Sequence, residues 1–71
     1  MAVSNLTYDL VTVLQNKMEA LSAYEHYLRD AQQSGDSQCQ ELFSQIQRDD
    51  EQHVKALEAC ISQLAQAGKF Q

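Results

Sequence analysis

The sequence predicts an all-α protein, an antiparallel hairpin of two helices, and three observations support this fold class. The 71-residue chain contains no proline and only two glycines, so nothing interrupts its long segments. Apolar residues recur at three- and four-residue spacing on both sides of one turn signal, Ser34-Gly35-Asp36-Ser37. A turn this short makes two helices antiparallel neighbours, here within a single domain of residues 1–71.

The first helix is expected to run from about residue 4 to residue 33. Ser4 or Asn5 can cap its start by accepting a hydrogen bond from the backbone. The turn then occupies 34–37, and Gly35 suits the left-handed conformation that follows a helix end. The apolar stripe that predicts the buried face consists of Leu6, Leu10, Val13, Leu14, Leu21, Tyr24, Leu28 and Ala31.

The second helix is expected from about 38 to 67, with Ser37 and Gln40 as a capping box and Gly68 as the stop. Its two cysteines would lie roughly 30 Å apart along the helix axis, which excludes a disulfide within the chain. We expect two small buried thiols, with a disulfide between two chains as the alternative. The apolar positions of this helix are Cys39, Leu42, Phe43, Ile46, Val54, Leu57, Ile61 and Leu64.

Two polar residues fall inside the apolar stripe of the second helix. On a wheel of about 100° per residue, Asp50 lies roughly 20° from Leu57, and His53 lies roughly 40° to the other side. Lys17 is expected to stand level with His53, because each is 18 residues from the pivot Gly35. Buried ionisable groups are costly unless they are paired, protonated or bound to metal. The sequence therefore predicts a buried polar centre of Lys17, Asp50 and His53.

The length and charge of the chain restrict its partners. A two-helix hairpin cannot cover both of its apolar stripes, so we expect a homodimer or larger assembly, with two copies forming a four-helix bundle. The formal net charge of −5 argues against binding to nucleic acid or to an anionic membrane. The stretch from Met1 to Leu14 has no basic region followed by an apolar run, so the cytoplasm is the expected location.

The stretch KMEALSAYEHYLRDAQQSGDSQCQELFSQIQRDDEQH, residues 17–53, resembles one helical hairpin of the ferritin-like superfamily, above all of the rubrerythrins. Hairpins of that family have a metal-ligating Glu on the first helix, a Tyr two turns later, a Gly at the turn and Glu-x-x-His on the second helix. The corresponding positions in this sequence are Lys17, Tyr24, Gly35 and Asp50-Glu51-Gln52-His53.

The first of these positions departs from the family pattern. Family sites hold two metal ions with about four carboxylates and two histidines, whereas Lys17 has no lone pair for a metal. Asp50 is one methylene shorter than Glu but remains an oxygen ligand. A dimer would offer two carboxylates rather than four and would add two ammonium groups. Tyr24 can support such a site through its hydroxyl or can serve as a core residue with a hydrogen-bonded tip.

Three functions therefore remain open. The first is a non-enzymatic assembly or regulatory module with a degenerate metal centre, in which Lys17 neutralises Asp50 and no cofactor is needed. The second is a protein that binds, oxidises or stores iron, or handles peroxide, with Asp50 and His53 of two chains holding iron or another divalent metal. The third is an adaptor whose apolar groove receives a helix of an unidentified protein. The sequence contains no catalytic residues that we can name and identifies no substrate.

Overall fold

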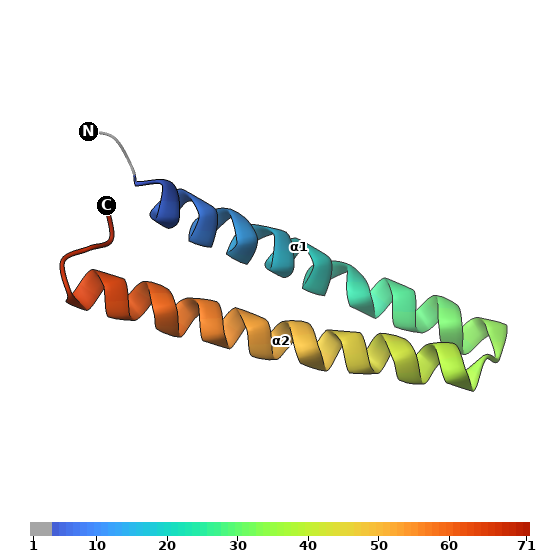
Figure 1. Cartoon of the computed structure of the whole chain (residues 1–71). Coiled ribbons are helices and arrows are strands. Elements are labelled where there is room, and N and C mark those ends of the chain that lie inside the picture. Colours follow the sequence, from blue (N-terminus) through green and yellow to red (C-terminus); the bar gives the residue numbers. More distant parts are fainter. Residues whose placement is uncertain (1–3) are drawn as a thin grey trace.

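The computed structural model describes residues 4–71, which form two long antiparallel helices joined by a tight turn. Helix α1 spans Asn5–Ser34 and helix α2 spans Ser37–Gln66, each within one residue of the bounds expected from the sequence. The two helices pack against each other, and the described residues contain no strand. The molecule is a rod with extents of 51 × 19 × 13 Å, and the start of α1 and the end of α2 lie at the end opposite the turn (Figure 1). The all-α hairpin expected from the sequence is confirmed.

The turn is built by one glycine and one aspartate. Gly35 has a φ of 76°, the left-handed conformation expected of it, and donates its N–H to the carbonyl oxygen of Gln32 at 3.1 Å. Asp36 then caps α2, because its carboxylate accepts the backbone N–H of Cys39 at 3.0 Å. The expected capping box of Ser37 and Gln40 is therefore wrong. Ser37 already has helical geometry, so its side chain is one position too late to act as the cap.

The open end of the hairpin is closed by a second glycine and by contacts between the chain ends. The N–H groups of Gly68 and Lys69 bond to the carbonyls of Ala65 and Leu64, which is the Schellman arrangement at the end of α2. The last residue then reaches α1. Ser4, the observed cap of α1, donates its N–H to the Gln71 carbonyl oxygen at 2.6 Å. The Gln71 N–H donates to the buried hydroxyl of Thr7 at 3.2 Å.

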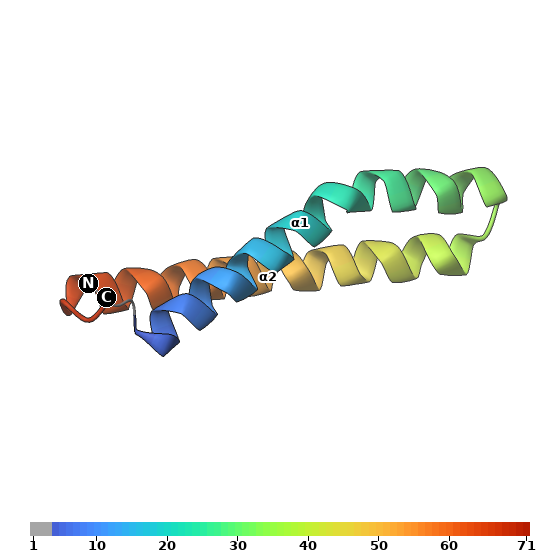
Figure 2. The ribbon, with the colours of Figure 1, turned by 90° about the horizontal axis from the view of Figure 1, so that it is seen from above.

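The interior of the rod is thin. Within residues 4–71, only Thr7, Tyr24, Ala31 and Asp50 are buried, and no side chain is fully enclosed. The helices cross when seen from above, so their contact moves around each helix along its length (Figure 2). Near the turn, the rings of Tyr27 and Phe43 bring the two helices together with their centroids 6.1 Å apart. None of the described helices is long and apolar enough to cross a membrane.

Candidate functional site

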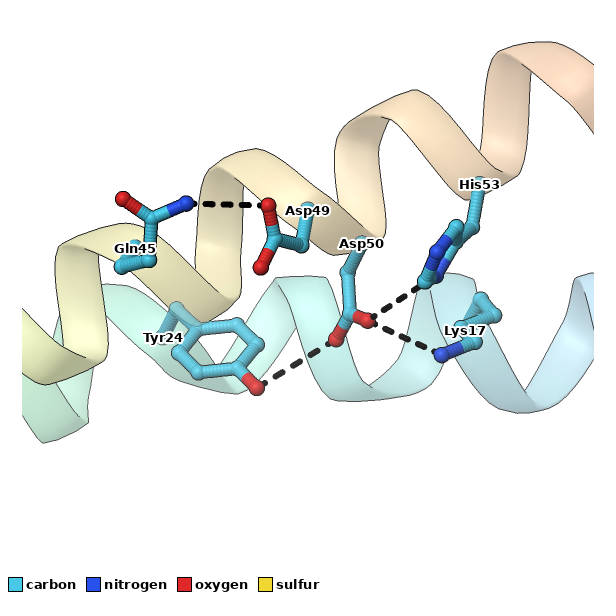
Figure 3. A network of polar contacts seen from close by, with 6 residues as sticks. All are labelled: Lys17, Tyr24, Gln45, Asp49, Asp50 and His53. Carbon is cyan, nitrogen blue, oxygen red and sulfur yellow. Dashed lines mark hydrogen bonds and ion pairs between the residues drawn. The ribbon is translucent and has the colours of Figure 1, made fainter.

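Asp50 forms the centre of a polar cluster between the two helices. Its residue surface is 7% exposed, and both of its carboxylate oxygens accept a hydrogen bond from α1. The ammonium of Lys17 lies 2.9 Å from Oδ1, and the hydroxyl of Tyr24 donates to Oδ2 at 3.3 Å (Figure 3). We call Lys17, Tyr24, Asp50 and His53 the polar centre. A carboxylate can remain at this depth because its charge is paired and both oxygens are bonded.

His53 lies at the edge of the polar centre. Its Nδ1 is 3.7 Å from Oδ1 of Asp50, which is the range of an ion pair rather than of a hydrogen bond. Figure 3 shows its ring on the same side of the Asp50 carboxylate as Lys17, with Tyr24 on the other side. The hairpin thus brings together the ammonium, the carboxylate and the imidazole that the register about Gly35 places at one level.

The hydrogen bonds of the cluster shift two of its pKa values. The hydrogen bond from Lys17 lowers the pKa of the Asp50 carboxyl, against the opposing effect of burial, and the Tyr24 hydroxyl lowers it further. Burial raises the pKa of Tyr24, and the negative charge of Asp50 raises it again. At neutral pH, Asp50 is therefore ionised and Tyr24 is a neutral donor. The pair of Lys17 and Asp50 carries no net charge.

His53 and the two cysteines were expected to be buried, and within a single chain this expectation is wrong. The His53 side chain is 58% exposed, and Cys39 and Cys60 are both exposed. Asp50 points at α1. Around the axis of α2, His53 is turned about 60° away from the direction of Asp50, and Cys60 is turned about 80° away on the same side. The contact between two helices covers only a narrow stripe, so these side chains lie beside the contact rather than in it. Cys39 lies in the first turn of α2, at the tip of the hairpin.

The donor atoms within one chain do not fit a metal ion. No group of three or more His, Cys, Asp or Glu residues within residues 4–71 is arranged to hold one. Asp50 has no oxygen without a hydrogen-bond donor, and the nearest donor is a cation, which would repel a metal. The arrangement present in one chain is a structural ion pair that links the two helices.

Sequence reasoning missed two features of the described residues. The first is the contact of Gln71 with Ser4 and Thr7, because no local pattern predicts which chain ends will meet. The second is an apolar patch of α1 that lies outside the predicted stripe and includes Val11 and Met18, 44% and 56% exposed.

Comparison of the chain with protein-family models, with curated proteins and with solved structures gives no match.

Proposed function

We propose that this chain is a non-enzymatic assembly module. In this proposal two hairpins pack into a four-helix bundle of ferritin-like arrangement, and ion pairs rather than metal ions hold its centre. The observation that carries the proposal is the surface of the single hairpin. The 8.0 kDa chain exposes 5402 Å² and encloses no described side chain fully. A compact monomer of that mass exposes about 4,450 Å², so the hairpin has roughly 950 Å² to spare.

The spare surface matches the area that a stable interface requires. Protein–protein interfaces of standard size bury about 800 Å² on each partner. Such burial would supply the hydrophobic stabilisation that a 71-residue hairpin lacks. A second copy of the same chain is the simplest source of a matching apolar surface, because a two-fold axis makes one patch complementary to itself.

The polar centre supports a module without metal chemistry. Each chain contributes one ammonium and one carboxylate, already 2.9 Å apart, so two chains bring two neutral pairs to the bundle interior. Paired groups of this kind can fix the register in which helices associate. A cluster that is already neutral requires no metal to balance the charge of Asp50.

Molar mass in solution and bound metal test the proposal together. We expect a particle of twice 8.0 kDa at tens of micromolar, with no stoichiometric metal after expression in medium rich in iron and manganese. A monomer, or one or more tightly held ions per dimer, would overturn the proposal. A monomer that gains mass only with another protein would point to the adaptor function.

One observation favours a second candidate, an iron-binding dimer. The exposed His53 and the carboxylate of Asp50 are neighbours, so two such pairs could meet across a two-fold axis. Lys17 opposes metal binding there, and its replacement separates the two candidates. If the remaining groups form a metal cage, Lys17→Glu binds iron in a titration that leaves the wild type unloaded. No uptake by either protein excludes the second candidate.

A further inference from the structure

The hairpin has two apolar hollows, and they involve different faces of α1. One, the interhelical groove, lies between the helices and is lined by Leu10, Val13, Lys17, His53, Leu57 and Cys60, among others. The other, the α1 patch, is formed by a single helix and includes Val11, Leu14, Met18 and Glu19. Two residues along a helix correspond to about 200° of rotation. Val11 and Val13 therefore line different hollows.

An exposed apolar side chain extends the interhelical groove along α1. Leu6 is 57% exposed and lies seven residues before Val13, so it shares the same face of α1. We call the groove together with Leu6 the docking face. It includes residues from both helices.

The charges of the two hollows differ. Within the interhelical groove, Lys17 is already paired with Asp50, and Nδ1 of His53 lies 3.7 Å from the same carboxylate. The α1 patch includes the carboxylate of Glu19, whose one hydrogen bond from a side chain comes from Gln15 at 3.4 Å. Covering the α1 patch would remove water from that carboxylate, whereas covering the groove buries charges that already have partners.

We propose that the second copy packs on the docking face and leaves the α1 patch in solvent. This inference rests on the proposed function, since it takes the partner to be another copy of this chain. The roughly 950 Å² by which one chain exceeds a compact monomer is close to one standard interface of about 800 Å² per partner. Use of one face gives a closed dimer, and the ionic pairs of Lys17 and Asp50 from both chains then lie in its interior.

Two valines of α1 provide a matched test. Val13 is 43% exposed in the groove and Val11 is 44% exposed on the α1 patch, so both are equally accessible in the single hairpin. We expect Val13→Asp to weaken dimerisation by at least about tenfold, because an added carboxylate loses its water in the interface. Val11→Asp should leave the dissociation constant within about twofold of the wild type, because surface changes have small effects. Sedimentation equilibrium measures all three constants.

The outcomes separate the inference from the function on which it rests. A wild-type monomer overturns both. Two outcomes in which the wild type is a dimer overturn the inference about the docking face alone. In the first, Val11→Asp weakens the dimer and Val13→Asp does not; in the second, both variants weaken it equally. Circular dichroism at the same concentrations shows whether a variant has lost its helices. If Val13→Asp has, Val13→Thr takes its place, and weaker dimerisation than in the wild type is again expected.

The thiol of Cys60 gives an independent measurement on the unmodified groove. Cys60 lines the groove and is exposed in the single hairpin. In a Cys39→Ser variant, the rate of maleimide labelling of Cys60 should fall at least about tenfold from a dilute sample to one well above the dissociation constant, because the partner covers the thiol. A labelling rate that is the same at both concentrations, in a sample shown to dimerise, would overturn the docking face.

Discussion

Asp50 shows how a single ionised residue is retained on the contact face of two helices. The carboxylate is surrounded by donors of α1, one charged and one neutral, and both of its oxygens are bonded. Lys17 therefore has two effects: it neutralises the acid and it ties the middle of α1 to the middle of α2. Removing one member of such a pair is more damaging than replacing both, because it leaves a charge without a partner.

Lys17→Met should lower the melting temperature, because Asp50 keeps its burial and loses its cation. The control is Lys55→Met, which removes the same charge from an exposed position of α2 and should change the free energy of unfolding by no more than about 0.5 kcal/mol. Thermal unfolding followed by circular dichroism at pH 7 compares the two variants. Equal losses would mean that net charge, and not the pair, sets the stability.

The effect of Asp50→Asn should depend on pH. The pKa of Asp50 is lower in the folded chain than in the unfolded one, so its stabilising effect is complete above the unfolded value and is lost as pH falls through the folded value. The melting temperature of the wild type should exceed that of Asp50→Asn at pH 7. The two should begin to converge as pH falls below about 4, the unfolded value, and should meet once pH has fallen through the lower pKa of the folded carboxyl. A difference that stays constant from pH 7 to pH 2.5 would contradict the role of the ionised pair.

The elements of this protein are set by short signals at their ends. Both helices are 30 residues long, and each is capped by a side chain that accepts a hydrogen bond from the backbone N–H three residues later. The cap is Ser4 in α1 and Asp36 in α2. The glycines at 35 and 68 both have positive φ and terminate the helices. Between these signals the helices have no proline or glycine, so the position of the turn determines which residues of α1 and α2 face each other.

Gly35→Ala should destabilise the hairpin by about 1–2 kcal/mol, because an alanine at a φ of 76° is strained. The position is otherwise open, with nothing within 4 Å of an added Cβ, so the loss would come from the backbone alone. Gly35→Asn is the control and should lose less, since asparagine tolerates the left-handed conformation. Chemical unfolding gives both values, and an alanine variant as stable as the wild type would contradict this account of the turn.

Asp36→Ala and Ser37→Ala test which residue caps α2. The backbone N–H of Cys39 lowers the pKa of the Asp36 carboxyl, so the cap is ionised at neutral pH and lies near the positive end of the helix dipole. We expect Asp36→Ala to lower the melting temperature at pH 7, and by less as pH falls from about 4, the unfolded value, through the lower pKa of the folded carboxyl. Ser37→Ala should have little effect. A greater loss in Ser37→Ala would restore the capping box.

At the scale of the whole molecule, the rod has too little interior for its surface. A width of 19 Å and a depth of 13 Å leave room for the two helices and for one line of contacts between them. His53 and Cys60 lie beside that line, as does the exposed Leu6. The single hairpin therefore exposes the residues that the proposed second copy would cover.

The melting temperature of the wild type should rise with protein concentration. Association stabilises the folded state by mass action, so a hundredfold increase in concentration is expected to raise the midpoint by several degrees. Val13→Asp is the control, and its midpoint should change less over the same range. A wild-type midpoint that is the same at both concentrations would mean that the hairpin is stable as a monomer.

The sequence by itself determined the helices, the turn and the level at which Lys17 meets Asp50. Helix ends depend on local signals such as Ser4 and Gly35, and an antiparallel hairpin with one pivot has only one register. These features need no knowledge of distant contacts, which is why spacing along the chain was enough to find them.

Only the tertiary structure decided how far each side chain of the apolar stripe is buried. The crossing of the two helices and the narrowness of their contact leave His53 and Cys60 exposed, although the wheel places both near the apolar side. The same geometry separates Val11 from Val13 and brings Gln71 to Thr7. Burial depends on what lies opposite a residue in space, and a periodic pattern within one helix does not contain that information.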